Sequence, residues 1–266
     1  MDVQTVTCVT YSPTRTTYRV VSAIANGLGA STITDVDLTW RKVGIKVTVA
    51  ADDVAVFGVP VYVGRVAATA VERLRSVKGR GTPALLVAVY GNRAYEDALV
   101  ELSDLVTAAG FVPVAAAAFI GEHSYTTEAT PIAVGRPDAQ DLEQACAFGR
   151  SVRALLEGMP RSRGFAPLVV PGNRPYRRGV RESDTAPSTQ AKLCTLCGLC
   201  ADACPVGAIS VSETVETDGL ACTLCSACIR VCPTGARVMK DEGVLKTARW
   251  LATEHSERKE PVTFLT

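Results

Sequence analysis

The sequence predicts an α/β fold in which a doubly wound parallel sheet of five strands is followed by a small α+β domain. Two observations lead to this prediction. In residues 1–157, apolar strand-like runs alternate with helical patterns, as in a parallel sheet covered by helices. Eight of the ten cysteines fall within residues 194–232. We therefore expect this C-terminal stretch to form a unit of its own.

The alternation begins with a strand and runs to about residue 157. The expected strands span Thr5–Thr10, Thr32–Leu38, Asp53–Phe57, Ala84–Tyr90 and Val112–Phe119. The expected helices span Thr17–Asn26, Ala67–Lys78, Tyr95–Ala109 and Asp138–Leu156. Pro137 favours the start of the last helix, because proline is tolerated in a first turn. Five strands with right-handed crossovers give a doubly wound sheet, which binds ligands in loops beyond the carboxyl ends of its strands.

Size and composition exclude several classes of protein. The chain has 266 residues and a formal charge of +1. Because 47% of the residues are hydrophobic, the chain has enough apolar material for one or two domains with a core. A pI near 7.5 disfavours a dedicated nucleic-acid binder, so no nucleic-acid partner is expected. The longest apolar stretches are about half of the ~20 residues that a spanning helix needs, so no transmembrane segment is expected. The first residues lack the features of a secretory signal, which predicts a cytoplasmic protein.

A change of composition divides the chain. Residues 158–192 are rich in Pro, Gly, Ser and Arg and have little periodicity, which predicts a linker. The linker joins a first domain, residues 1–157, to a cysteine-rich domain, residues 193–240. Residues 241–266 are expected to be a C-terminal extension. The apolar segment 167–176 of the linker is expected to lie against a domain surface.

The cysteine-rich domain contains an internal repeat. LCTLCGLCADACPVGA, from residue 193, aligns with ACTLCSACIRVCPTGA, from residue 221. Each copy has the spacing Cys-x2-Cys-x2-Cys-x3-Cys-Pro, which is the bacterial spacing for cubane iron–sulfur clusters, and the fourth cysteine of each run ligates the other cluster. By this rule one cluster uses Cys194, Cys197, Cys200 and Cys232, and the other uses Cys222, Cys225, Cys228 and Cys204.

This segment resembles the bacterial two-[4Fe-4S] ferredoxins over residues 193–240. The resemblance implies a small α+β domain that binds two [4Fe-4S] clusters. Zinc is the alternative, but zinc sites usually consist of paired CxxC units separated by a longer loop. Three cysteines at x2 spacing, present twice, do not pair in that way.

A loop rich in hydroxyl groups follows the first strand and precedes a helix, which is a favourable place for an anion. Here the chain resembles the flavodoxins, whose first loop holds the phosphate of FMN. The resemblance implies a phosphate site at Ser12, Pro13, Thr14, Arg15, Thr16 and Thr17. Arg15 stands where the family usually has glycine, and its guanidinium could pair with the phosphate. An ordinary helix cap is the alternative interpretation of this loop.

Two further loops follow the third and fourth strands at their carboxyl ends. They resemble the flavodoxin loops on either side of the isoalloxazine ring, with Tyr62 and Tyr95 at the aromatic positions. The FMN-binding residues implied are Pro60, Val61, Tyr62, Val63 and Gly64 in one loop and Tyr90, Gly91, Asn92, Arg93 and Tyr95 in the other. Core or surface tyrosines are the alternative. Arg65 and Arg93 could offset the charge of a reduced flavin. After the fifth strand, His123 could approach a cofactor or lie in solvent.

Taken in order, the two parts resemble the flavodoxin–ferredoxin fusion proteins, with a flavodoxin-like sheet followed by a ferredoxin domain. The resemblance implies an electron-transfer protein that passes electrons between two [4Fe-4S] clusters and FMN, with redox proteins as partners. No catalytic residue is assigned, because no acid–base set for a substrate appears in the flavin loops. One alternative is a flavin reductase that acts on a small acceptor such as a quinone, or on NAD(P)H. Another is a redox-sensing or structural iron–sulfur module.

Overall fold

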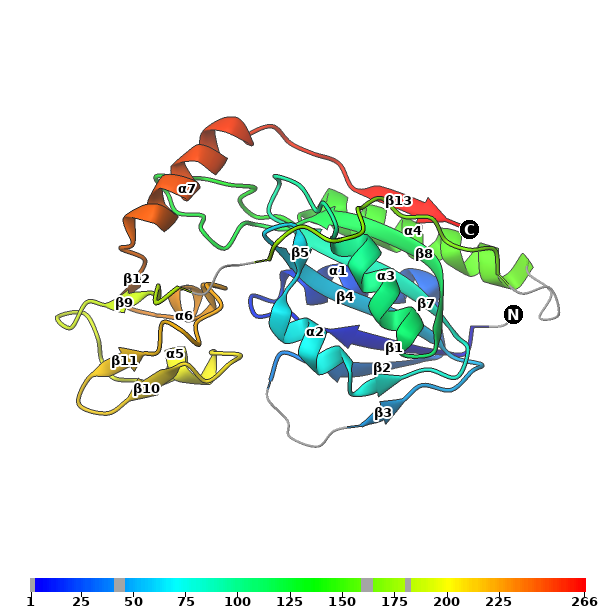
Figure 1. Cartoon of the computed structure of the whole chain (residues 1–266), viewed down its shortest axis with the longest axis horizontal. Helices are drawn as coiled ribbons and strands as arrows, with labels where there is room; N and C mark the ends of the chain where they lie inside the picture. The colour runs from blue at the N-terminus through cyan, green and yellow to red at the C-terminus, as the bar shows by residue number, and fades with distance from the viewer. Residues whose placement is uncertain (1–2, 41–45, 159–164, 180–182) are drawn as a thin grey trace.

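The computed structural model describes residues 3–40, 46–158, 165–179 and 183–266. Its centre is a sheet in which five parallel strands lie in the order β2, β1, β4, β7, β8 (Figure 1). These strands are β1 (Thr5–Thr10), β2 (Thr32–Asp37), β4 (Val54–Tyr62), β7 (Thr82–Tyr90) and β8 (Phe111–Ile120). The strand order reverses direction beside β1, as in other doubly wound sheets. The predicted fold class is confirmed.

Two pairs of helices cover the sheet. α1 (Thr16–Leu28) and α4 (Ala139–Gly158) share one apolar core with one face, and α2 (Ala68–Leu74) and α3 (Ala98–Ala108) share another core with the opposite face. α1 and α4 lie so close that a Cβ added to Gly27 would be 2.0 Å from the carbonyl oxygen of Cys146. Glycine at this position therefore allows the two helix backbones to touch.

Most element boundaries lie within two residues of the expected ones, and those of β4, α2 and α3 differ by more. β4 continues to Tyr62 and turns through Val63 and Gly64, both at positive φ, into the antiparallel strand β5 (Arg65–Val66). The segment expected as a loop is therefore largely strand, because residues 58–60 pair with β7 and Val61 and Tyr62 pair with β5. α2 ends at Leu74, since the following residues form β6 (Val77–Lys78), which pairs with β3 (Val47–Thr48).

α3 begins at Ala98 rather than at Tyr95. The residues before it form a turn in which Glu96 has a positive φ and the N–H of Ala98 donates to the carbonyl of Tyr95. The carboxylate of Asp97 accepts hydrogen bonds from the backbone N–H groups of Asn173 and Arg177. Asp97 thus anchors the segment between the domains rather than continuing the helix.

The described part of that segment, residues 165–179, lies along the first domain. Leu168 and Val170 pack against its core, and Arg174 forms an ion pair with Asp104 at 2.6 Å. The apolar segment of the expected linker therefore lies on a domain surface, as expected. Residues 159–164 and 180–182 of the expected linker lie outside the described residues.

The cysteine-rich part follows the internal repeat. α5 (Leu199–Asp202) and α6 (Ala227–Arg230) occupy equivalent positions, and each half has a two-stranded sheet. The strands are β10 (Ile209–Val211) with β11 (Val215–Thr217), and β12 (Arg237–Val238) with β9 (Ser188–Thr189). Each half therefore repeats the same local structure.

Residues 241–266, expected as an extension, run back to the first domain (Figure 1). They form α7 (Glu242–Glu254) and β13 (Val262–Leu265), and β13 adds an antiparallel strand to the edge of the sheet beside β8. We call residues 255–261, which connect α7 to β13, the strap. The chain thus crosses from the first domain to the cysteine-rich part and back.

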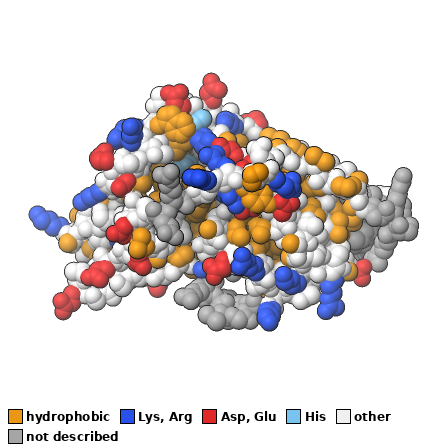
Figure 2. All heavy atoms as spheres, in the orientation of Figure 1, with side chains coloured by type: hydrophobic (Ala, Val, Ile, Leu, Met, Phe, Trp, Pro, Cys, Tyr) orange, Lys and Arg blue, Asp and Glu red, His pale blue; other side chains and the backbone are white. Residues whose placement is uncertain are grey.

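Charges of both signs are interspersed on the face of the molecule shown in Figure 2. Hydrophobic side chains appear on the same face between them. Within the described residues, no helix combines the length and the apolar character that crossing a membrane requires.

Candidate cofactor sites

The eight clustered cysteines line two separate cavities. Cys194, Cys197, Cys200 and Cys232 line the first, and Cys204, Cys222, Cys225 and Cys228 line the second. Each cavity thus has three cysteines from one copy of the repeat and one from the other. We call these groups the first and second cysteine sets. This is the crossed arrangement that the spacing predicts for two cubanes.

The backbone between the cysteines has the same conformation in both halves. Leu196 and Leu224 both have φ of 54°, and the equivalent Gly198 and Ser226 have φ of 80° and 59°. Successive residues of this kind direct their N–H groups to one side, which forms a concave site for an anion. The N–H of Leu196 approaches the Sγ of Cys194 at 3.5 Å, and the N–H of Ala208 approaches the Sγ of Cys204 at 3.2 Å. N–H groups placed in this way stabilise sulfur ligands that carry negative charge.

Single-ion geometry is not found here. Among the residues that the structure describes, no three or more Cys, His, Asp or Glu side chains converge on one metal position. Burial raises the pKa of the Cys225 thiol to about 11, so this thiol becomes a ligand only when a cation displaces its proton. Two cavities that are each lined by four cysteines fit a pair of polynuclear clusters.

A third cavity, of about 1050 Å³, lies between the first domain and the cysteine-rich part. One side of its lining comes from the three loops that the sequence predicts to bind FMN. The other side comes from the second cysteine set and from α7. The residues of these loops that line the cavity are Ser12, Pro13, Thr14, Thr16, Thr17, Pro60, Val61, Tyr62, Val63, Gly64, Tyr90, Gly91 and Arg93.

The loop before α1 presents hydroxyl groups at a helix N-terminus. The hydroxyl of Ser12 accepts a hydrogen bond from the N–H of Tyr18 at 3.1 Å, and the hydroxyls of Thr14 and Thr16 are 3.3 Å apart. Thr17 is fully buried, and its hydroxyl has no hydrogen-bond partner within the described chain. A buried hydroxyl without a partner is costly, so the loop fits a ligand that supplies an acceptor, such as a phosphate.

Arg15 adopts the left-handed conformation that glycine would favour, with φ of 64°. Its side chain lies outside the lining of the cavity. The guanidinium is 3.6 Å from the carboxylate of Asp37 and 3.7 Å from the ring centre of Tyr18. In this structure the positive charge therefore points to neighbours other than the cavity.

Two residues of the fourth-strand loop also lie outside the cavity lining. The ring of Tyr95 packs edge-on against Tyr90, with 5.5 Å between ring centres. The amide of Asn92, only 2% exposed, donates to the carbonyls of His255 and Glu257 in the strap. The structure thus leaves Tyr62, rather than Tyr95, on the cavity wall.

The two arginines near these loops have different surroundings. Arg65 is held by Glu101 through hydrogen bonds of 2.7 and 2.6 Å, and it does not line the cavity. Arg93 does line the cavity, and burial lowers the pKa of its guanidinium. Arg93 also forms an ion pair with Glu96 at 2.9 Å.

His123 lies on the cavity wall and is half-buried. Burial, with contributions from Arg230 and Arg93, lowers the pKa of His123 to about 4. Its Nδ1 accepts a hydrogen bond from the N–H of Tyr125 at 3.0 Å, so the neutral ring carries its proton on Nε2. A Cβ on Gly91 would be 2.1 Å from the His123 ring, and glycine is therefore needed at residue 91 for this ring to fit.

Sequence reasoning missed the cavity residues contributed by α7. Val244, Thr247, Trp250 and Leu251 line it, and no motif in residues 241–266 indicates this. Their place follows from the tertiary path alone. The only local signal is the start of the helix, where the carboxylate of Asp241 accepts a hydrogen bond from the N–H of Val244 at 2.9 Å.

The second cysteine set adjoins this cavity, and the first does not. Thr223, Leu224 and Cys225 line the cavity, whereas no cysteine of the first set does so. Burial raises the pKa values of Tyr62 and Tyr11, with a further contribution from Cys225. Tyr62 and Cys225 both line the cavity.

Direct contacts hold the cysteine-rich part against the first domain. Arg73 of α2 donates to the carbonyl of Pro205 at 2.6 Å. Arg230 of α6 pairs with Glu122 at 2.8 Å and donates to the carbonyl of His123 at 3.0 Å.

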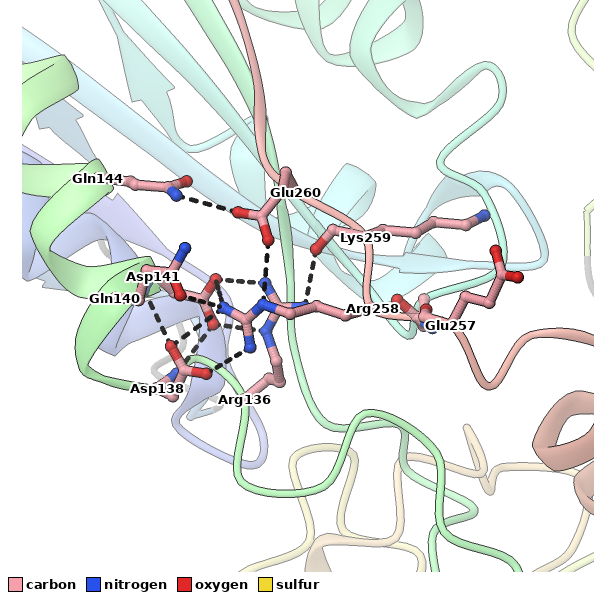
Figure 3. Close-up of polar contacts among 10 residues, drawn as sticks. Arg136, Asp138, Gln140, Asp141, Gln144, Glu257, Arg258, Lys259 and Glu260 are labelled. Carbon is pink, nitrogen blue, oxygen red and sulfur yellow. Dashed lines mark hydrogen bonds and ion pairs between the residues drawn. The ribbon is translucent and has the colours of Figure 1, made fainter.

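The strap adds a second group of contacts, drawn in Figure 3. Arg136 is bound to Asp141, and it also donates to the carbonyl of Lys259. Arg258 reaches Asp138 at 2.7 Å. In addition, the ammonium group of Lys259 donates to the carbonyl of Arg93 at 2.5 Å. The strap therefore connects α4 to the loop that carries Asn92 and Arg93.

Comparison with known proteins gives one family match. Residues 193–236 match the model of the 4Fe-4S dicluster domain, which confirms the iron–sulfur character of the cysteine repeat. No curated protein matches the sequence of the chain.

Solved structures of flavodoxins resemble the first part of the chain. A flavodoxin from the domain Archaea has 11% identity and a TM-score of 0.37, covering 58% of this chain and 99% of its own. The flavodoxin of Streptococcus pneumonia TIGR4 has 14% identity and a TM-score of 0.37, covering 57% and 99%. A Fusobacterium nucleatum flavodoxin bound to flavin mononucleotide has 17% identity and a TM-score of 0.36, covering 58% and 99%.

Proposed function

We propose that this chain is an electron-transfer protein of the flavodoxin–ferredoxin fusion type. It holds FMN in residues 1–157 and two [4Fe-4S] clusters in residues 193–240. When bound, FMN exchanges one or two electrons and each cluster exchanges one, so the chain links one-electron carriers to a two-electron step or to a partner enzyme. The observation that carries this proposal is the cavity lined both by the three predicted flavin loops and by Cys225.

Each group of residues has a separate task in this proposal. The hydroxyls of Ser12, Thr14 and Thr17 bind the phosphate, and Tyr62 contacts the flavin ring. The two cysteine sets bind one cluster each. The three predicted flavin loops lie at the carboxyl ends of parallel strands, where doubly wound sheets bind their ligands.

The two cysteine sets differ in their distance from the flavin loops, which supports an order of the cofactors. The second set adjoins the flavin cavity through Cys225. In the first set Cys197 is exposed, as are Leu196 and Leu199 beside it. We therefore propose that redox partner proteins exchange electrons at the first set and that the second set communicates with the flavin.

The test is an anaerobic purification of the full chain with flavin and iron quantified. We expect one FMN and about eight iron atoms per chain. After addition of a limiting amount of dithionite, absorbance and electron paramagnetic resonance should show electrons shared between clusters and flavin. The proposal is contradicted if the purified protein contains no FMN, or if it contains too little iron for even one cluster.

Variants in the two cysteine sets test the order of the cofactors. Cys225→Ser should interrupt electron exchange with the flavin. Cys197→Ser should leave that exchange in place and slow reduction by an external protein donor. If Cys197→Ser only lowers stability and leaves every electron-transfer rate unchanged, the structural-module alternative is favoured.

A flavin reductase remains a second candidate because α7 gives the cavity an additional apolar wall that includes Trp250 and Leu251. Such a wall suits a small planar acceptor. Steady turnover of a quinone or of NAD(P)H by the isolated protein, strongly reduced in Tyr62→Ala, favours the reductase. Absence of turnover with full electron exchange between cofactors favours the carrier.

A further inference from the structure

Arg237, the first residue of β12, is an arginine buried to 2% exposure. Its Nη1 donates to the hydroxyl of Thr189 at 2.7 Å, and its Nη2 donates to the hydroxyl of Thr217 at 3.0 Å. Its Nε is buried and has no hydrogen-bond partner within the described chain. Among the residues described in the structure, no carboxylate pairs with this guanidinium. Proteins rarely bury a charge without a counter-charge, because the loss of hydration is not offset.

Arg237 touches both cysteine sets. Its side chain lines the cavity of the first set, and its backbone N–H is hydrogen-bonded to Cys232, a member of that set. Its Nη2 also lies 3.8 Å from the Sγ of Cys228, a member of the second set. The unpaired cation is therefore placed between the two groups of thiols.

Arg237 breaks the symmetry of the internal repeat, because the matching position in the first copy holds a different type of residue. The alignment that matches Pro205, Gly207 and Ala208 with their counterparts matches Ile209 with Arg237. Ile209 occupies the corresponding strand position in β10 and is only half-buried. One half of the domain thus carries a buried positive charge for which the other half has no equivalent.

Building on the proposed function, we infer that Arg237 is the shared counter-charge of the two clusters and raises their reduction potentials. Four thiolates give each bound cluster a net negative charge. Entry of one electron adds one more negative charge, while all four Fe–S(Cys) bonds stay intact. A nearby buried cation stabilises the more negative form more strongly, because the interaction is poorly screened in the interior. Arg237 acts here as a positioning residue for charge rather than as a ligand.

The inference is tested by redox titration of the full chain under anaerobic conditions, followed by electron paramagnetic resonance. Arg237→Gln removes the charge and keeps a polar side chain. Arg237→Lys keeps the charge. Lys240→Gln is the matched control, because Lys240 is exposed and lies three residues away in the same domain. Iron content is measured for every sample before titration, and the iron content of the wild-type protein tests the proposed function separately.

In Arg237→Gln with its full iron content, we expect the ratio of oxidised to reduced cluster at a fixed potential to rise at least tenfold. This corresponds to a reduction potential lower by about 59 mV for a one-electron couple. Arg237→Lys should recover at least half of that shift, and Lys240→Gln should leave the potentials unchanged. Unchanged potentials in fully loaded Arg237→Gln overturn the inference. Equal shifts in the Gln and Lys variants also overturn it, because the shape of the side chain would then matter and its charge would not.

If Arg237→Gln loses iron, its potentials cannot be compared with those of the wild type, and Arg237→Lys then decides the test. If this variant keeps its iron and its potentials stay within about 30 mV of the wild-type values, half of the shift expected for loss of the charge, the charge is sufficient and the inference stands. If Arg237→Lys loses iron as well, the inference is overturned, because a charge in this position would not satisfy the site.

Discussion

At the scale of one residue, Thr17 is the residue of the first domain that most specifically indicates a phosphate ligand. Its hydroxyl is buried and has no partner in the described chain. Its methyl group lies beside Gly58, where an added Cβ would be 3.0 Å away. Valine at residue 17 would preserve this packing and remove only the hydroxyl.

We expect Thr17→Val to weaken the binding of FMN by about tenfold or more, because a hydrogen bond to a charged group contributes about 1.5–3 kcal/mol. Titration of the flavin-free protein with FMN, followed by quenching of flavin fluorescence, measures the dissociation constant. Thr107→Val on the exposed surface of α3 is the control and should bind FMN normally. Equal affinities for Thr17→Val and the control would remove Thr17 from the site.

His123 makes stability depend on pH. The pKa of its imidazole is about 4 in the folded protein because of burial, Arg230 and Arg93, whereas an unfolded histidine titrates near pH 6.5. Between these values the unfolded chain holds a proton that the folded protein does not hold. The free energy of unfolding therefore decreases as the pH falls from about 6.5 toward 4.

His123→Gln should remove part of this acid sensitivity. Between pH 7.5 and 5.5, we expect the free energy of unfolding of the variant to fall by about 1 kcal/mol less than that of the wild type, because the ring is only partly buried. Urea denaturation at the two pH values measures the difference. His255→Gln, which changes the other histidine of the chain, should retain the larger loss. If both variants behave like wild type, His123 is not the group responsible.

At the scale of elements, two ion pairs of different burial fix the strap: Arg136, which is paired with Asp141, donates to the carbonyl of Lys259, and Arg258 of the strap pairs with Asp138. Asp141 has no exposed side-chain surface and Arg136 is 5% exposed, whereas Arg258 and Asp138 are about 40% exposed. Figure 3 shows the two arginines converging on the acidic start of α4. Breaking a buried pair leaves an uncompensated charge, whereas an exposed pair is screened by water.

We therefore expect Arg136→Met to lower the free energy of unfolding by about 3–5 kcal/mol. Arg258→Met, the matched change on the exposed side, should lower it only slightly. The midpoints of urea denaturation measure both effects. Similar losses in the two variants would mean that Asp141 finds another partner when Arg136 is absent.

On the scale of the whole molecule, the return of the chain through α7, the strap and β13 holds the cysteine-rich part over the flavin loops. Other polar contacts between described residues also span the interface, among them Arg73 with Pro205 and Arg230 with Glu122. β13 is fixed by backbone pairing to β8. The relative placement of the cofactor sites thus depends on a segment distant from all of them.

Deletion of residues 255–266 should leave FMN and iron bound and separate the two parts of the molecule. We expect a larger radius of gyration by small-angle X-ray scattering and slower electron exchange between clusters and flavin, because the deletion removes the contacts of the strap and the pairing of β13 with β8. An unchanged radius and an unchanged rate would show that the direct contacts alone hold the parts together.

Much of this protein could be predicted from the sequence because the signals are local. The five parallel strands follow from alternating apolar runs, and β1 has the predicted bounds Thr5–Thr10. The two cysteine sets follow from ligand spacing within one short repeat. The hydroxyl loop before α1 is recognisable because the residues that form it are consecutive.

The tertiary structure alone decided which of these features meet. Pairing with β7, and with β5 at Val61 and Tyr62, made residues 58–62 a strand rather than a loop, and contacts with the strap drew Asn92 away from the cavity wall. Likewise, α7 lies at the flavin cavity through packing of Ala248 and Leu251 with Ile132 and through the pairing of β13 with a strand about 150 residues earlier in the chain. A local pattern specifies what a segment can become, because propensity and ligand spacing act over a few residues. The contacts that place one segment against another depend on packing between distant parts of the chain, which no local pattern records.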